Sequence, residues 1–127
     1  MKAKPMKIQT IHYFDASHQL RDSPDLFTKK CAQLHGHTYK VKVTIEGQND
    51  RSGMVIDFGK VKETVNVLDH KHINGIFEEY GIDKPATAEN IAIFLKDFIG
   101  QQLNLNVLEV SICEGYKGDE HSNWVTV

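Results

Sequence analysis

Apolar and polar side chains alternate along two stretches in the first half of the chain, as in strands that bury one face of a sheet. The stretch from Ile8 to Ser17 predicts one strand, and a more regular alternation from His35 predicts a second. In each strand, every second residue is expected on the buried face. These residues are Ile8, Thr10, His12, Phe14, Ala16 and His18 in the first strand, and His35, His37, Tyr39, Val41, Val43 and Ile45 in the second. Histidines therefore occupy the expected inner face of both strands.

After a turn-rich segment at residues 47–53, the apolar spacing changes to the period of a helix. Asp57 stands at an N-cap position, and Thr87 is a second candidate cap with Glu89 in the following turn. The stripes of the two helices are Phe58, Val61, Val65 and Leu68, then Ile91, Phe94, Leu95 and Phe98. A loop is expected from Asn74 to Pro85, and Gly100 is expected to end the second helix.

Strand-like alternation returns from Val107 to Glu114, and Trp124 to Val127 predicts a short last strand. The residues expected on one face of the third strand are Leu108, Val110, Ile112 and Glu114. The order strand, strand, helix, helix, strand, strand favours an α+β fold with a four-stranded antiparallel sheet and two helices on one face. A length of 127 residues fits a single domain, residues 1–127.

Composition and charge exclude several classes of protein. The net charge of −2 argues against a nucleic-acid partner, which needs a concentrated positive field. The chain contains no apolar run of the ~18 residues that a membrane helix needs, and no apolar segment follows its basic N-terminus as in a signal peptide. Two cysteines do not make a disulfide scaffold, so a reduced, cytoplasmic protein is expected.

The seven histidines are many for this length, and three of them form a candidate metal site. His35 and His37 lie two apart on a strand, so their side chains point the same way. His18 ends the first strand, and a hairpin of the two strands would bring it beside them. Three histidines leave a fourth position open, as in catalytic zinc sites. The alternative is that each histidine caps an element or is half-buried in the core.

Cys31 is a candidate base or nucleophile, because three residues separate it from His35 and two lysines precede it. The alternative is an inert buried thiol, an interpretation that fits Cys113. Asp69 and His70 form a possible acid–base dyad. Adjacent side chains on a helix do not face each other, so the dyad requires the backbone to leave the helix there. Otherwise the imidazolium interacts with the helix C-terminus.

Glu114 shares the parity of the buried face of its strand, and a buried carboxylate needs partners. Paired N–H groups of a heterocyclic ligand would satisfy it. An unseen basic partner or an exposed strand end would satisfy it equally well.

Several short motifs together resemble the 6-pyruvoyl-tetrahydropterin synthase family, which includes the 6-carboxy-tetrahydropterin synthases. They occur in the family's order at residues 14–18 (FDASH), 31–39 (CAQLHGHTY), 54–58 (MVIDF), 68–70 (LDH), 87–90 (TAEN) and 113–114 (CE). The resemblance implies the T-fold, or tunnelling fold, in which subunits join edge to edge as homo-oligomers, usually hexamers of two trimers. It also implies active sites that form between subunits.

The resemblance implies roles for individual residues. The family's zinc ligands match His18, His35 and His37. Its catalytic base matches Cys31, assisted by residues that match Asp69 and His70. The glutamate that anchors the pterin ring matches Glu114. Thr87 and Glu89 match a segment near the pterin pocket. Candidate contacts to the substrate's triphosphate are Lys29, Lys30 and Lys117.

The two main branches of the family share the substrate 7,8-dihydroneopterin triphosphate. One yields 6-carboxy-5,6,7,8-tetrahydropterin, acetaldehyde and triphosphate on the route to queuosine; the other yields 6-pyruvoyl-tetrahydropterin for tetrahydrobiopterin. The short spacing between Cys31 and His35 implies the carboxy branch, because pyruvoyl enzymes typically carry an insert there. A pterin-binding zinc protein without turnover is a third hypothesis.

Overall fold

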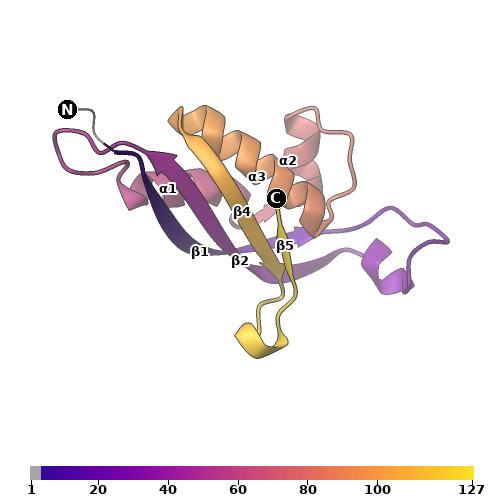
Figure 1. The fold of residues 1–127 in the computed structure, drawn as a ribbon. Helices are drawn as coiled ribbons and strands as arrows, with labels where there is room; N and C mark the ends of the chain where they lie inside the picture. The colour runs from indigo at the N-terminus through magenta and orange to yellow at the C-terminus, as the bar shows by residue number, and fades with distance from the viewer. Residues whose placement is uncertain (1–3) are drawn as a thin grey trace.

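The computed structural model describes residues 4–127, which form one five-stranded sheet with helices packed on one of its faces (Figure 1). The strands are β1 (Met6–His18), β2 (His35–Gly47), β3 (Lys71–His72), β4 (Asn106–Glu114) and β5 (Trp124–Thr126). The helices are α1 (Phe58–Val65), α2 (Ile73–Glu79) and α3 (Ala88–Leu103), and 3₁₀ turns η1, η2 and η3 span Lys29–Ala32, Asn66–Leu68 and Asp119–His121. The sheet order is β3-β1-β2-β4-β5.

The α+β prediction is confirmed, whereas the expected four strands and two helices are too few. The segment from Asn74 to Pro85, expected to be a loop, contributes α2, whose Ile73 and Phe77 enter the core. β3 pairs with β1 in parallel, so the sheet is mixed rather than antiparallel throughout. A two-residue strand and a seven-residue helix are too short for periodicity to reveal.

The β1–β2 hairpin confirms the expected parity of both strands. The register pairs Phe14 with Tyr39 and His18 with His35, and the rings of Phe14 and Tyr39 stack with centroids 4.9 Å apart. One face of β2 is fully buried from Tyr39 through Ile45 at every second residue. This face and the apolar stripes of the helices, apart from the exposed Phe58, form one continuous core, which supports the end of the hairpin that carries the histidines.

One position in β4 differs from the expected alternation. Thr44 pairs with Glu109 and Ile45 pairs with Val107, so Leu108 is the extra residue of a β-bulge. Val107 is therefore buried in place of the predicted Leu108, which is half-buried. Beyond the bulge the predicted parity holds, and it places Glu114 opposite Tyr39 at the end of the strand.

Both predicted helix caps are confirmed, because Asp57 accepts a hydrogen bond from the Gly59 N–H and Thr87 accepts one from the Asn90 N–H. The predicted end at Gly100 is wrong, because α3 continues to Leu103. Asn104 ends it with a left-handed φ of 52°, a conformation that asparagine tolerates better than most residues.

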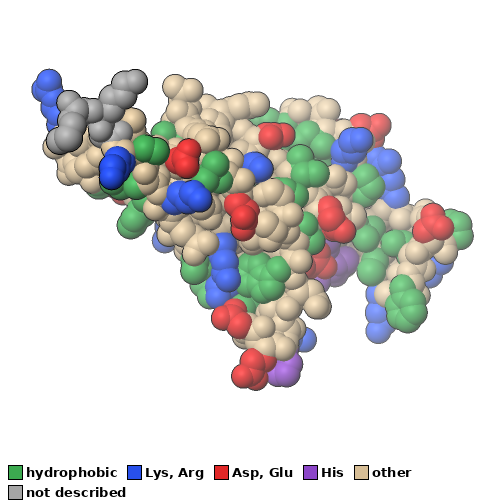
Figure 2. All heavy atoms as spheres, viewed as in Figure 1, with side chains coloured by type: hydrophobic (Ala, Val, Ile, Leu, Met, Phe, Trp, Pro, Cys, Tyr) green, Lys and Arg blue, Asp and Glu red, His purple; other side chains and the backbone are tan. Residues whose placement is uncertain are grey.

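The segment between β1 and β2, residues 19–34, projects from the body of the molecule (Figure 1). Figure 2 shows hydrophobic, basic and acidic side chains on this projection, and Phe27 on it is fully exposed. Among residues 4–127, no helix has both the length and the apolarity needed to cross a membrane.

His12 is buried on the inner face of β1 and shares a 2.8 Å hydrogen bond with Thr10. Burial, with a smaller contribution from the charge of Lys62, lowers its pKa from 6.5. The unfolded chain therefore takes up this proton at a higher pH than the folded chain does. We expect His12 to contribute stability that is fully present above pH 6.5 and is lost as the pH falls through the interval below 6.5.

Urea unfolding of the wild type and of His12→Gln between about pH 7.5 and 5.5 measures this contribution. The free energy of unfolding should fall less steeply with decreasing pH in the variant than in the wild type. Equal slopes would show that His12 does not carry the pH dependence. The difference between the two slopes removes the contribution of the other histidines, because both proteins contain them.

Candidate metal centre and acid–base groups

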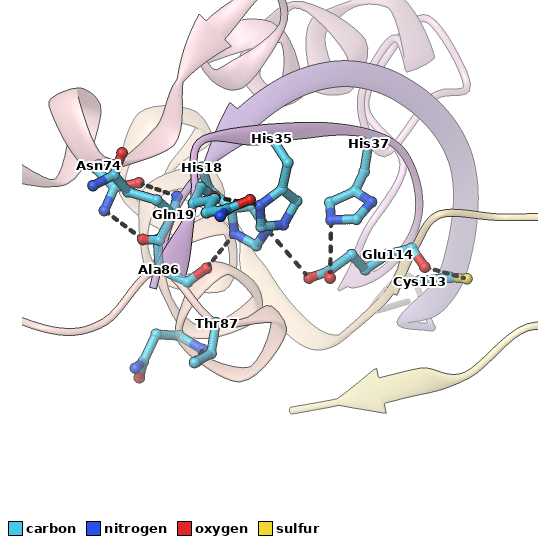
Figure 3. Close-up of polar contacts among 11 residues, drawn as sticks. His18, Gln19, His35, His37, Asn74, Ala86, Thr87, Cys113 and Glu114 are labelled. Carbon is cyan, nitrogen blue, oxygen red and sulfur yellow. Dashed lines mark hydrogen bonds and ion pairs between the residues drawn. The ribbon is translucent and has the colours of Figure 1, made fainter. Parts of the chain in front are cut away.

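Three histidine rings meet where β1 ends and β2 begins (Figure 3). The centroid distances are 4.5 Å between His18 and His35, 5.1 Å between His18 and His37, and 4.8 Å between His35 and His37. The antiparallel register causes this meeting, since it places His18 directly opposite His35 and strand parity turns His37 to the same face. The structure therefore brings together all three predicted metal ligands.

Backbone carbonyls orient two of the three rings for metal binding. The His18 Nδ1–H donates to the carbonyl of Ala86 at 2.7 Å, and the His35 Nδ1–H donates to that of Gln33 at 2.7 Å. Each bond selects the tautomer that leaves a lone pair on Nε2. The Nε2 atoms of His18 and His37 are buried without a hydrogen-bond partner among residues 4–127. Buried polar atoms of this kind favour a bound ligand.

Glu114 adds a carboxylate to the histidine cluster. Its Oε1 lies 3.1 Å from Nε2 of His37, and its Oε2 lies 3.9 Å from Nε2 of His18 (Figure 3). Potential ligand atoms of the four residues all lie within 4.8 Å of one another. A set of three imidazoles and one carboxylate is suited to zinc or a similar divalent transition metal. The geometry thus fits a metal ion of this class.

The surroundings of the cluster favour neutral imidazole at His37. Burial lowers the pKa of His37, the charges of His18 and His35 lower it further, and Glu114 opposes the shift. A neutral ring keeps the lone pair that metal binding requires. Beneath the cluster, burial and then Glu114 raise the pKa of Tyr39, whose hydroxyl is a third buried group without a hydrogen bond among the described residues.

Asp69 and His70 form the contact that a dyad requires, with 3.1 Å between Asp69 Oδ1 and His70 Nδ1. The backbone leaves the helical path here, because η2 ends at Leu68 and His70 has a φ of 58°. Asp15 holds both residues: its N–H donates to Asp69 Oδ1 at 3.1 Å, and its carbonyl accepts from the His70 N–H at 2.7 Å. The Asp15 N–H is also the main reason why the pKa of Asp69 lies below its usual value.

The dyad and the histidine cluster are separate groups within one chain. Asp15, Asp69 and His70 form one set of potential ligand atoms, and the three cluster histidines form another with Glu114. Asp15 and Thr38 hydrogen-bond to each other and occupy the positions of their strands that face outward. His18 and His37 occupy the positions that face inward. His70 and His37 line the same surface cavity, but the dyad is not among the potential metal ligands of its own chain.

Cys31 lies in η1 on the projecting segment and is partly exposed. Among residues 4–127, its sulfur does not belong to the group of side chains at the histidine cluster. Its carbonyl accepts a 2.8 Å hydrogen bond from the N–H of Leu20, which ties η1 to the chain just beyond His18. The predicted base is therefore connected to the cluster through the backbone and is not one of its potential ligands.

Thr87 and Glu89 lie at the start of α3, next to the site. Thr87 uses its hydroxyl to cap the helix, and the preceding residue, Ala86, supplies the carbonyl that orients His18 (Figure 3). Glu89 is exposed in the first turn. Sequence reasoning missed Ala86 and Gln33, because a backbone carbonyl leaves no signal in the residue type. It also missed Asp15. The available clue was that Asp15 occupies an outward-facing position of the first strand.

The chain matches the family described as 6-pyruvoyl tetrahydropterin synthase over residues 7–125. It is 36% identical over 110 residues to the 6-carboxy-5,6,7,8-tetrahydropterin synthase of Rickettsia typhi, covering 71% of this chain and 77% of that relative. The dihydroneopterin monophosphate aldolase of Pyrococcus furiosus is 32% identical over 117 residues, covering 87% of this chain and 91% of the relative.

The solved structure of Caenorhabditis elegans 6-pyruvoyl tetrahydropterin synthase superimposes with a TM-score of 0.67 and 22% sequence identity. The match covers 100% of this chain and 97% of that one. At this identity the likeness establishes the fold alone, and it confirms the expected T-fold.

Proposed function

The chain belongs to the 6-pyruvoyl tetrahydropterin synthase family, a family of pterin lyases, and on this premise we propose a specific reaction for it. The protein is a zinc-dependent lyase that converts 7,8-dihydroneopterin triphosphate and water to 6-carboxy-5,6,7,8-tetrahydropterin, acetaldehyde and triphosphate. The observation that carries the proposal is the convergence of His18, His35 and His37, with two buried Nε2 atoms that form no hydrogen bond and face the carboxylate of Glu114. The relative in Rickettsia typhi bears the name of this activity.

His18, His35 and His37 hold the metal through their Nε2 atoms in this proposal. Bound there, zinc supplies Lewis-acid chemistry, which stabilises negative charge that develops on the substrate side chain. The carbonyls of Ala86 and Gln33 keep the rings of His18 and His35 directed at one point, so the site needs little reorganisation.

Cys31 is the base that removes a proton from the side-chain carbon of the substrate. His70, oriented by Asp69, gives and takes protons at the side-chain oxygens. The dyad contacts Asp15 on the outward face of the sheet and forms a group separate from the metal ligands of its own chain. This separation supports a homo-oligomer, a trimer or a hexamer of two trimers, in which the dyad of one subunit serves the metal centre of another.

Glu114 anchors the pterin, because a carboxylate accepts two hydrogen bonds from adjacent N–H groups of a heterocycle. Its side chain is 33% exposed at the end of β4 and lies beside the cluster, where an anchored ring would present its side chain to the metal. Thr87 and Glu89, at the start of α3, contact the pterin in the same proposal. The two free cysteines support a reducing, cytoplasmic location.

The carboxy product is preferred to the pyruvoyl product because only three residues separate Cys31 from His35. The product would then supply queuosine synthesis. The Pyrococcus furiosus relative raises a second candidate, since its name specifies a monophosphate substrate and an aldolase reaction, and the match covers most of both chains. The two candidates differ in the phosphorylation state of the substrate, which makes them separable by experiment.

We expect the zinc-loaded protein to release 6-carboxy-5,6,7,8-tetrahydropterin and acetaldehyde from 7,8-dihydroneopterin triphosphate, as measured by mass spectrometry of the products. A parallel reaction with 7,8-dihydroneopterin monophosphate serves as the control and should leave that substrate unchanged. A 6-pyruvoyl product would contradict the carboxy assignment and keep the site. Turnover of the monophosphate alone would favour the aldolase, and unchanged substrates with zinc bound would favour a binding protein.

A further inference from the structure

Asn74, in the first turn of α2, forms two hydrogen bonds with the backbone of a single residue at the end of β1 (Figure 3). Its Oδ1 accepts from the Gln19 N–H at 3.0 Å, and its Nδ2 donates to the Gln19 carbonyl at 2.9 Å. A side-chain amide has one acceptor and one donor side, so it replaces the backbone of a neighbouring strand. Asn74 thus extends the sheet beyond the point where β3 ends.

The Asn74 contact is the last of a continuous series that joins residues 69–74 to residues 15–19. The series begins at the Asp69–His70 dyad, which holds both backbone groups of Asp15. It continues through the parallel pairing of β3 with β1 and ends at Gln19. The same short segment therefore carries the dyad at one end and Asn74 at the other, and it borders the strand that carries His18.

Gln19 connects the metal centre to Cys31. It follows His18 directly and precedes Leu20, whose N–H donates to the Cys31 carbonyl at 2.8 Å. The projecting segment has few other ties to the body. Its ion pair between Arg21 and Asp83 joins side chains that are 66% and 94% exposed, and exposed pairs contribute little. No residue of η1 is buried. Cys31 is therefore held from two sides: by residues 32–34, which join it to His35, and by the start of the segment through Leu20.

We propose that Asn74 is a positioning residue that sets the location of Cys31 relative to the metal centre. The proposal rests on the catalytic role proposed for Cys31. His18 is held independently of Asn74, by its pairing with His35 and by the carbonyl of Ala86. Removing the Asn74 amide therefore frees the start of the projecting segment, at Gln19 and Leu20, and leaves the metal ligands in place.

The test compares the zinc-loaded full chain with Asn74→Ala and Asn74→Asp. Misplacing a catalytic group by about 1 Å costs up to 10²-fold, so we expect kcat of Asn74→Ala to fall about 10- to 100-fold with a nearly unchanged KM. Zinc stoichiometry should stay at the wild-type value. Asn74→Asp keeps the acceptor for the Gln19 N–H and loses the donor, so its kcat should lie between the two.

Hydrogen exchange at the Leu20 amide provides a readout that does not depend on turnover, and it should accelerate in Asn74→Ala. Asn49→Ala is the matched control. Asn49 is exposed in the turn that follows β2, and β2 begins at His35, so Asn49 lies at the far end of this strand from the histidines. Its kcat and its Leu20 exchange rate should equal those of the wild type.

Unchanged kcat and unchanged Leu20 exchange in Asn74→Ala would overturn the proposal. Loss of zinc from this variant would also overturn it, because Asn74 would then support the ligands rather than Cys31. If the wild type itself fails to convert 7,8-dihydroneopterin triphosphate, the proposed function fails. The exchange rate at Leu20 then still decides whether Asn74 holds the segment: faster exchange supports this and unchanged exchange contradicts it.

Discussion

Cys31→Ala is expected to abolish measurable turnover of 7,8-dihydroneopterin triphosphate while zinc stays bound. A positioned base contributes about 10²- to 10⁴-fold to a proton transfer, and the thiolate is the nucleophile or base that alanine cannot replace. Zinc remains because the cluster consists of His18, His35, His37 and Glu114, without Cys31. Steady-state kinetics and metal analysis of the same preparation measure both effects.

Cys113→Ala is the matched control for this substitution. Cys113 is buried in β4, so its substitution removes packing contacts and should lower the free energy of unfolding by about 1 kcal/mol or somewhat more. The kcat should stay within a few-fold of the wild type. The pair therefore separates loss of a thiol in general from loss of the thiol at position 31. Wild-type activity in Cys31→Ala would refute the assignment of the base.

His35→Ala is expected to lose zinc and, with it, turnover. The variant removes one of three imidazoles whose Nε2 atoms converge, and the two that remain cannot complete a zinc site with an open position. Loss of an outer-shell partner alone lowers metal affinity about 10- to 100-fold, so loss of a direct ligand should exceed that range. Metal content after dialysis against a weak chelator measures the loss.

His121→Ala controls for the removal of any histidine. His121 is exposed in η3 and lies outside the cluster, so its variant should keep zinc and activity. Stoichiometric zinc in His35→Ala would refute the ligand set. Circular dichroism of both variants would show whether a loss of metal accompanies a loss of fold, since His35 also pairs with His18 in the hairpin.

The part of the site that the sequence alone could predict is the part that lies on strands. Side chains on a strand alternate strictly, so His18, His35 and His37 could be assigned to one face before any pairing was known. The motif resemblance supplied the roles of Cys31 and Glu114, which alternation alone left open.

The sequence did not predict the turns or the contacts between side chains that are distant along the chain. The dyad depends on the left-handed φ of His70 and on the backbone of Asp15, which lies 54 residues from Asp69. Periodicity does not detect elements as short as β3 and α2, so Asn74 was interpreted as part of a loop and its bonds to Gln19 were missed. The bulge at Leu108 likewise follows from how β4 meets β2.

The fold class, the two long strands, both helix caps and the common face of three histidines follow from local periodicity and backbone preference, so they can be read from the sequence. The convergence of the rings, the addition of Glu114 to them, and the separation of the dyad and Cys31 from the ligand group are visible only in the folded chain. These features depend on strand register and on contacts between residues distant in sequence. Such contacts form only when the hydrophobic core assembles, and local patterning does not specify them.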